Sequence, residues 1–398
     1  MGKKAKGINV SQLRGWAVRA LSKALVFASF FLLIVFSQNE CQAGTNPESS
    51  LKYGPVFGLV LPNSMTMQWS TNSPVHCTVK TEDCNQKAVT DDGFFHFVRI
   101  EGLKPGEPIE GKIIVEETAN QIPFSFSTPV KSPETWDFIA YGDTQALVNK
   151  HEEVVHAIEN ESEAPNFCFL LGDLTYHGGI KALWDNFFSI EKPLMKKLPF
   201  LSCLGNHDER GQEYFGLFYN PLSDVDSKRA WYSFRYQNAV FLVLDPKSEV
   251  EPQIDFTQRV LERANEDGIE WKIVICHYPP ISSGKHGGDP ILKERFVPLF
   301  EKYGVNLGLF GHEHINELNV KNNVTYLTVR GSGPTRITPT QRNPYSLWVS
   351  NELSFARIRV SPQKMEVNLK GVDGKIINSF SLEASKANFS VTSAKLNN

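Results

Sequence analysis

The sequence has few cysteines and none of the closely spaced cysteine pairs that hold structural zinc. Six of its 398 residues are cysteine, and no C-x-x-C pattern occurs, so a thiolate zinc site is not expected. Cys168, Cys203 and Cys276 each lie in an apolar, strand-like stretch, where cysteine usually acts as a small buried hydrophobic residue. Cys77 and Cys84 lie close together among short strands, and an oxidising compartment could join them in a disulfide.

The sequence also lacks a strong excess of charge of either sign, and it has no internal repeat. Lysine and arginine together number 41 and aspartate and glutamate 44, which gives a formal net charge of -3. Without a broad basic excess, nucleic-acid binding is not expected. Hydrophobic residues make up 41% of the chain, which at this length is enough for two or three domains with a substantial core.

Long apolar runs are absent except near the N terminus. Residues 1–23 carry several basic side chains and no acidic one, and an apolar run follows from Ala24 to Phe36. This run is shorter than the roughly 20 residues of a membrane-spanning helix, and its basic flank and the small residues near Ala43 are typical of a signal peptide. We therefore expect residues 1–43 to be a signal peptide and the protein to be secreted, or to lie in the periplasm or another extracytoplasmic compartment. The alternative is an uncleaved anchor, which would be the only attachment to a membrane.

Three N-x-S/T triplets are present, at Asn160, Asn323 and Asn388. In a eukaryotic secretory pathway each can accept an N-linked glycan, so the protein could be a glycoprotein. Patterns this short often arise by chance, and they do not identify the source.

The rhythm of apolar residues divides the rest of the chain into two folded parts and a tail. Short alternating stretches separated by proline and glycine predict a small all-β sandwich at residues 44–130. From residue 131 to 385, apolar strand-like stretches alternate with amphipathic helical ones, which predicts a layered α/β domain with buried sheets. Residues 386–398 are expected to be a tail.

Polar side chains follow five apolar stretches of the second part, where each expected strand ends. The motifs are GDTQ with Asp143, GDLTY with Asp173 and Tyr176, GNHD with Asn206, VICH with His277, and GHEH with His312 and His314. Because the carboxyl ends of strands in an α/β sheet line one crevice, we expect these side chains to converge. Buried together without a cation, they would be costly to desolvate. Two ions of iron, manganese or zinc about 3.5 Å apart would explain the set, with Asp173 as the bridging carboxylate.

Each of these residues taken alone has an ordinary structural explanation. An aspartate after a glycine is most often a turn residue, and a histidine at a strand end is often a core or surface residue. A tyrosine such as Tyr176 can pack at a sheet edge. It is the ordered set of five motifs that favours a metal site.

Together the five motifs resemble the signature of the calcineurin-like metallophosphoesterases, and the tyrosine of GDLTY narrows the resemblance to the purple acid phosphatases. The resemblance covers about residues 50–385, since members of that family often carry an N-terminal fibronectin-like β-sandwich. It implies an α/β fold, a metallophosphoesterase β-sandwich flanked by helices, preceded by a small all-β fibronectin-like domain.

The resemblance also implies a set of metal ligands around iron(III) and a second ion, which would be iron(II), zinc or manganese. The ligands implied for iron(III) are Asp143, Tyr176 and His314, those for the second ion are Asn206, His277 and His312, and Asp173 bridges the two. A phenolate is a hard anionic donor that suits a trivalent ion, whose binding lowers the pKa of the phenol. Gln145 stands where the wider superfamily often has a histidine ligand, and we expect it to be a poor ligand that could contact substrate.

The function implied is that of an exported acid phosphatase that hydrolyses small phosphate monoesters by in-line attack of a metal-bound hydroxide. His207 would contact the phosphate and protonate the leaving oxygen, or alternatively support a neighbouring metal ligand. His286, in the glycine-rich segment 281–290, would be a second phosphate contact, or alternatively a solvated loop histidine.

Two other functions are compatible with the same sequence. A phosphodiesterase or nucleotide hydrolase would use the same site and differ in the walls of its pocket. An exported binding protein with a vestigial metal site belongs to another class, and the presence of all seven expected ligands argues against it.

Overall fold

The computed structural model describes residues 51–384 except 91, 132–134, 146, 209–210, 219–229 and 335–337. The expected signal peptide, the expected tail and Asn388 lie outside the described residues. Within the described part of the chain, no helix is both long and apolar enough to cross a membrane.

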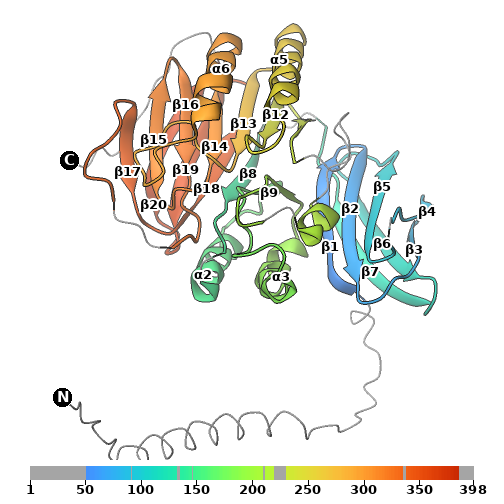
Figure 1. Cartoon of the computed structure of the whole chain (residues 1–398). Helices are drawn as coiled ribbons and strands as arrows, with labels where there is room; N and C mark the ends of the chain where they lie inside the picture. The colour runs from blue at the N-terminus through green and yellow to red at the C-terminus, as the bar shows by residue number, and fades with distance from the viewer. Residues whose placement is uncertain are drawn as a thin grey trace, which may run out of the picture. The chain divides into compact units, whose positions relative to one another are not determined.

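The first part of the described chain is entirely β, as Figure 1 shows. Its strands are β1 (Leu51–Leu61), β2 (Ser64–Thr71), β3 (Cys77–Thr81), β4 (Asn85–Lys87), β5 (Phe95–Glu101), β6 (Pro108–Val115) and β7 (Asn120–Ser127). They form two antiparallel sheets, in the orders β1-β2-β5 and β4-β3-β6-β7. Met67 and Trp69 of the first sheet and Val79 and Ile113 of the second share one buried cluster. This agrees with the predicted small sandwich.

Cys77 and Cys84 are both free thiols. Thr78 is paired with Lys87 across the β3–β4 hairpin, so Cys77 lies at the open end of the hairpin while Cys84 lies near its turn. The strand register therefore separates two cysteines that are close in sequence. The Cys77–Cys84 disulfide that the sequence allowed is not formed.

The second part is built on two larger sheets. The first has the order β10-β9-β8-β18-β19-β20 and the second the order β11-β12-β13-β14-β16-β15-β17. The strands of the first are β8 (Trp136–Tyr141), β9 (Phe167–Leu170), β10 (Phe200–Ser202), β18 (Ser354–Val360), β19 (Lys364–Gly371) and β20 (Ile376–Glu383). Those of the second are β11 (Tyr232–Tyr236), β12 (Ala239–Leu244), β13 (Trp271–Cys276), β14 (Leu307–Phe310), β15 (Asn316–Lys321), β16 (Val324–Thr328) and β17 (Ser346–Ser350).

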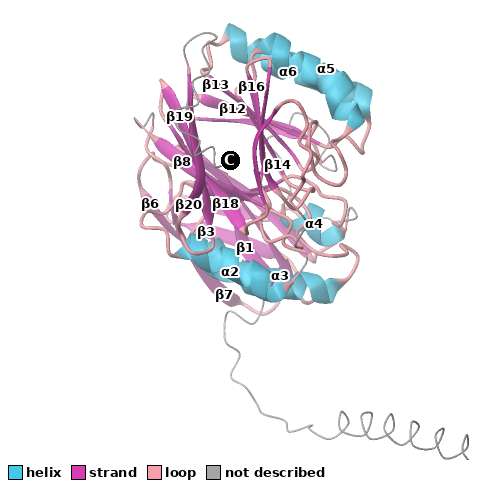
Figure 2. Cartoon of the chain, turned by 90° about the vertical axis from the view of Figure 1, so that its left-hand side faces the viewer, coloured by secondary structure: helices cyan, strands magenta, loops and turns pink. Residues whose placement is uncertain are grey.

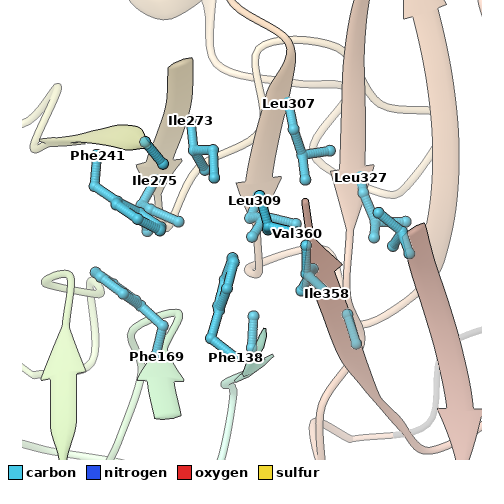
Figure 3. Packing of buried hydrophobic residues seen from close by; sticks show 14 of the residues in the cluster. Phe138, Phe169, Phe241, Ile273, Ile275, Leu307, Leu309, Leu327, Ile358 and Val360 are labelled. Atoms are coloured by element: carbon cyan, nitrogen blue, oxygen red, sulfur yellow. The ribbon is translucent and has the colours of Figure 1, made fainter. Parts of the chain in front are cut away.

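The two sheets pack face to face around one apolar core (Figure 3). Phe138 and Ile358 point inward from the first sheet, and Ile273 and Leu309 from the second. Every residue of β8, β9, β12, β13 and β14 is buried, because helices cover the outer faces of these strands as well.

The helices cover the outer faces of both sheets (Figure 2). Their bounds are α2 (Val148–Glu159), α3 (Lys181–Met195), α4 (Gln212–Leu217), α5 (Val250–Glu266), a π-helical turn η2 (Leu292–Phe296) and α6 (Val297–Tyr303). α2 and α3 share a buried cluster with β8 and β9, whereas α5 and α6 share one with β12 and β13. The predicted β-sandwich flanked by helices is therefore confirmed.

The strands that carry the polar motifs belong to both sheets. β8, β9 and β10 are parallel neighbours in the first sheet, and β13 and β14 are parallel neighbours in the second. The motifs do converge, but the expectation that they meet at the crevice of a single open sheet is wrong. The motifs meet because the carboxyl ends of these two strand groups lie at the same edge of the packed sheets.

Candidate metal centre

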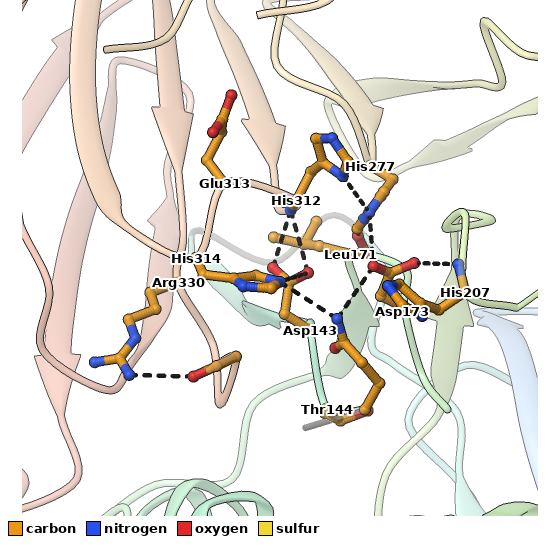
Figure 4. Close-up of polar contacts among 12 residues, drawn as sticks. Asp143, Thr144, Leu171, Asp173, His207, His277, His312, Glu313, His314 and Arg330 are labelled. Atoms are coloured by element: carbon orange, nitrogen blue, oxygen red, sulfur yellow. Dashed lines mark hydrogen bonds and ion pairs between the residues drawn. The ribbon is translucent and has the colours of Figure 1, made fainter. Parts of the chain in front are cut away.

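Two groups of potential metal ligands lie at this edge and share one carboxylate (Figure 4). The first consists of Asp173, His277 and His312, and the second of Asp143, Asp173 and His314. Within each group, the ligand atoms all lie within 4.8 Å of one another. Asp173 belongs to both groups, which is the position expected of a bridging ligand.

The carboxylates of the two groups are enclosed. Asp143 and Asp173 are 0% and 1% exposed, and His277 is 0% exposed. Two carboxylates buried this closely repel each other and lose their hydration, which costs free energy unless positive charge is brought to them. The site therefore has the electrostatics of a cation-binding site.

His277 is oriented as a metal-binding histidine. Its Nδ1 donates a hydrogen bond of 2.7 Å to the carbonyl of Leu171, which leaves Nε2 directed at Asp173, 3.2 Å from Oδ2. A backbone carbonyl that holds one ring nitrogen in this way fixes the tautomer and the ring orientation of a ligand. Burial opposes the charged form of His277, but the Asp173 carboxylate outweighs it and raises the pKa of His277 to about 9 in the metal-free protein.

The amide of Gln145 lies between the two groups. Its Nε2 is 3.2 Å from Oδ2 of Asp173 and 3.3 Å from Nε2 of His314. Nε2 of His314 in turn lies 3.4 Å from Oδ1 of Asp143. Gln145 thus donates to groups that are expected to bind metal, which agrees with its expected weakness as a ligand.

The backbone turns sharply at the ends of the motif strands. Asp143, Asp173, His312 and His314 all have positive φ, between 51° and 70°, a conformation that few residues other than glycine adopt. Such local strain is held in place by the surrounding structure, and it is often found at functional sites. Here it directs side chains from different strands toward one point.

The glycines in front of Asn206 and His312 are required by space. A Cβ on Gly205 would lie 2.1 Å from Oδ1 of Asp173, and one on Gly311 would lie 2.8 Å from Oδ2 of Asp143. The backbone segments of the motifs therefore approach the carboxylates too closely for any side chain. The glycines of the two GD motifs are close to other groups, since a Cβ on Gly142 would lie 2.9 Å from Cβ of Leu171 and one on Gly172 would lie 2.8 Å from Nδ1 of His277.

Tyr176 and Asn206 differ from the other expected ligands in being exposed. Tyr176 is 64% exposed, and its ring centroid lies 5.2 Å from that of His207. The two residues are carried by the same strand-end loops as Asp173 and His207, but their roles as ligands stay predictions.

The two histidines expected to contact phosphate lie next to the ligand groups. The backbone N–H of His207 donates to Oδ1 of Asp173 at 2.8 Å, and its Nδ1 donates to the Tyr176 carbonyl at 2.8 Å. The ring of His286 lies 4.4 Å from that of His312, measured between centroids. Both side chains remain partly accessible to solvent.

Asp208 supports the site, and sequence reasoning gave it no role. Its fully buried carboxylate accepts hydrogen bonds from the backbone N–H groups of Asp173 at 3.0 Å, Leu174 at 2.8 Å and Gly205 at 2.8 Å. Burial and the nearby Asp173 charge raise the pKa of Asp208 to about 7. It joins the loops after β9 and β10, and the only sequence signal for it was the acidic residue that ends GNHD.

Several known proteins that resemble this chain are named phosphoesterases or phosphatases. Residues 137–316 match the model of the calcineurin-like phosphoesterase family. A probable inactive purple acid phosphatase 24 of Arabidopsis thaliana is 28% identical over 202 residues, which cover 44% of this chain and 32% of that relative. The tartrate-resistant acid phosphatase type 5 of Oryctolagus cuniculus is 24% identical over 292 residues, which cover 61% of this chain and 89% of that relative. The chain thus spans only about a third of the plant relative.

Among solved structures, the purple acid phosphatase PPD1 from seeds of yellow lupin (Lupinus luteus) has a similar fold. The TM-score is 0.69 at 16% sequence identity, with 85% of this chain and 77% of the lupin chain covered. A structure of PhoD is similar with a TM-score of 0.65 at 12% identity, with 89% of this chain and 94% of that chain covered. At these identities the likeness concerns the fold.

Proposed function

Residues 137–316 form a calcineurin-like phosphoesterase domain, and from this premise we propose that the protein is a dinuclear metal-dependent phosphatase that hydrolyses phosphate monoesters. The observation that carries the proposal is the pair of ligand groups that share Asp173. A mixed set of carboxylate and imidazole donors suits iron, manganese or zinc.

The donor set fits two different ions. In our proposal Asp143 and His314, with Tyr176, hold iron(III), and His277 and His312, with Asn206, hold iron(II), zinc or manganese. The hard phenolate and carboxylate oxygens favour the trivalent ion at the first position, and the two imidazoles favour the divalent ion at the second. Two such ions, when bound, polarise the phosphoryl oxygens and lower the pKa of bound water.

The chain's own residues would orient the substrate and supply a proton. Because Nδ1 of His207 is engaged by the Tyr176 carbonyl, Nε2 is the nitrogen that can face substrate. His207 would donate a proton to the leaving oxygen through this atom. His286 would contact the phosphate from the other side of the site, next to His312.

Some relatives of this chain carry the word inactive in their names, so activity needs a direct test. The protein should be loaded with iron and zinc and assayed on p-nitrophenyl phosphate and bis(p-nitrophenyl) phosphate. We expect faster hydrolysis of the monoester. Equal or faster hydrolysis of the diester would overturn the monoester preference, and a protein that holds two ions but hydrolyses neither ester would favour the vestigial site.

The shared carboxylate provides the matched variant for this test. Asp173→Asn should lose at least about 100-fold in activity together with bound metal, since even outer partners of metal ligands contribute 10- to 100-fold. Asp255→Asn makes the same change on the exposed side of α5 and should retain both metal and activity.

Export also belongs to this proposal. It is supported by the basic and apolar N-terminal sequence and by the exposure of Asn160 and Asn323, the described glycosylation triplets. Expression in a eukaryotic secretory host tests it: we expect product in the medium that begins after residue 43 and shifts in mass on glycosidase treatment. Intracellular retention of the full chain would contradict it.

A further inference from the structure

Glu313 is a buried carboxylate that the proposed reaction does not use. It stands between His312 and His314 in GHEH, yet it belongs to neither ligand group. Its side chain is fully buried and is turned away from Asp143 and Asp173 (Figure 4).

The contacts of Glu313 lie on the glycine-rich segment that carries His286. Oε2 of Glu313 accepts a hydrogen bond of 3.0 Å from the His286 backbone N–H, and the same oxygen lies 3.4 Å from Nδ1 of the His286 ring. Oε1 is buried and accepts no hydrogen bond from the part of the chain that the structure describes. The carboxylate is thus directed at one residue, which it holds by both backbone and ring.

A second buried carboxylate, Glu317, anchors the same segment three residues earlier. Its Oε2 accepts from the Ser283 backbone N–H at 2.8 Å, and its Oε1 accepts from the Ser283 hydroxyl. Asn343 adds a hydrogen bond of 2.8 Å from its backbone N–H to the same hydroxyl. With Ser283 fixed in this way, the orientation of His286 depends on its contact with Glu313.

The place at which Glu313 holds His286 is favourable for binding phosphate. The His286 ring lies 4.4 Å from the His312 ring between centroids, and its side chain is 39% exposed. One face of the ring therefore adjoins a proposed metal ligand while part of it remains open to an approaching anion. We propose that Glu313 is a positioning residue that holds His286 where it contacts the phosphate group of the ligand; this inference rests on the proposed function.

The cost of burying Glu313 supports a functional role. A buried carboxylate with few hydrogen-bond donors costs stability. Glutamine has the same shape and could still accept the bond from the His286 N–H without the charge. The charge therefore adds little to folding, and its effect is to attract and orient the His286 ring.

Binding of orthophosphate to the metal-loaded protein, measured by calorimetry, tests this role without turnover. We expect Glu313→Gln to weaken phosphate binding about 5- to 10-fold, the size of one ordinary hydrogen bond, with metal content unchanged and a melting temperature no lower than that of the wild type. His286→Ala should weaken binding at least as much, and the double variant should bind no worse than His286→Ala alone. Glu294→Gln, on the exposed side of η2, is the control and should bind like the wild type.

A space-filling substitution gives a second test. A Cβ on Gly284 would lie 2.4 Å from Oε2 of Glu313, so Gly284→Ala should displace the carboxylate and weaken phosphate binding to a similar extent. In a Glu313→Ala background the same substitution should have little further effect. With a phosphate ester as substrate, Glu313→Gln should raise KM more than it lowers kcat.

Three results would overturn the inference: wild-type affinity for phosphate in Glu313→Gln, multiplicative losses in the double variant, or loss of metal from Glu313→Gln. The last would show that Glu313 acts on His312 or His314 instead. If the wild type binds two ions and phosphate but hydrolyses no ester, the proposed function fails while the positioning role stands. If the metal-loaded wild type binds no phosphate, the positioning role of Glu313 fails.

Discussion

His277 and Asp173 form a buried pair in which Nε2 of the imidazole lies 3.2 Å from Oδ2 of the carboxylate. Burial alone would raise the pKa of Asp173, but the His277 charge outweighs it and lowers that pKa. Burial alone would lower the pKa of His277, but the Asp173 charge outweighs it and raises that pKa to about 9. In the metal-free protein at neutral pH, a proton on His277 therefore occupies the place where a cation is expected to bind.

Metal binding should release this proton. A histidine must be neutral to bind a metal, so below pH 9 the affinity should rise by about tenfold per pH unit from His277 alone. Burial, followed by the charge of His277, lowers the pKa of His312 to about 2, so His312 contributes no proton. Calorimetric titration of zinc in buffers of different ionisation enthalpy should show about one proton released at pH 7. The same affinity at pH 6 and pH 8, without proton release, would contradict the pairing.

The same pair should make the stability of the metal-free protein depend on pH. Since the folded pKa of His277 is raised, its contribution is complete below the unfolded value of about 6.5 and is lost as the pH rises toward 9. The contribution of Asp173, whose folded pKa is lowered, is lost only in acid. The melting temperature of the metal-free protein should fall between pH 6.5 and 9, and that of the metal-loaded protein should fall less. Parallel curves for the two forms would show that the pair does not control this range.

Tyr176→Phe tests the proposed phenolate ligand. An iron(III) phenolate absorbs visible light, so the iron-loaded protein should be purple and the variant should lose the band. Tyr176 is largely exposed, so its hydroxyl has room to turn toward the ion. Tyr345→Phe, which also removes one phenol hydroxyl, should keep the colour. A colourless wild type with two ions, and full metal content in Tyr176→Phe, would show that the phenolate assignment is wrong.

His207→Gln should slow the hydrolysis of esters according to their leaving groups. A general acid contributes about 100- to 10,000-fold when the leaving oxygen needs a proton. We expect a loss of about 100-fold in kcat for an alkyl phosphate and a much smaller loss for p-nitrophenyl phosphate, whose leaving group is stable as an anion. The control is His156→Gln, on the exposed face of α2. Equal losses on both substrates would assign His207 to support of the metal ligands.

Asp208→Asn should weaken both the fold and the metal site. The carboxylate accepts three backbone hydrogen bonds, whereas an asparagine offers one acceptor oxygen and turns an N–H₂ group toward other donors. Leaving buried donors unsatisfied costs about 1–3 kcal/mol. Because the three bonds together fix the backbone around Asp173, zinc affinity should fall as well. Denaturant unfolding and metal titration measure the two effects, and a variant that unfolds earlier but binds zinc normally would confine Asp208 to a structural role.

The polar residues at strand ends could be recognised from the sequence because each of them closely follows the apolar run that forms its strand. A buried strand is a short apolar run, and a donor such as Asp143 or His277 directly after it must lie at an edge of a sheet. The glycine of the GD, GN and GH motifs marks a close approach of backbone segments, although only the structure shows which group is the neighbour, as for Gly205 and Asp173. In this way sequence reasoning reached Asp143, Asp173, His277, His312 and His314 as a group.

Other features depend on which segments become neighbours, and periodicity carries no such information. A strand buried on both faces has the same pattern in one sheet as in two, so the division of the motifs between the sheet of β8 and the sheet of β13 could not be predicted. Asp208 and Glu313 looked like ordinary acidic residues of a motif, since their partners at Leu174 and His286 come from other loops. The sequence by itself determined which chemical groups this protein has and at which strand ends they stand. Tertiary packing decided which of them meet, because distances between distant segments are set by the contacts of the whole core.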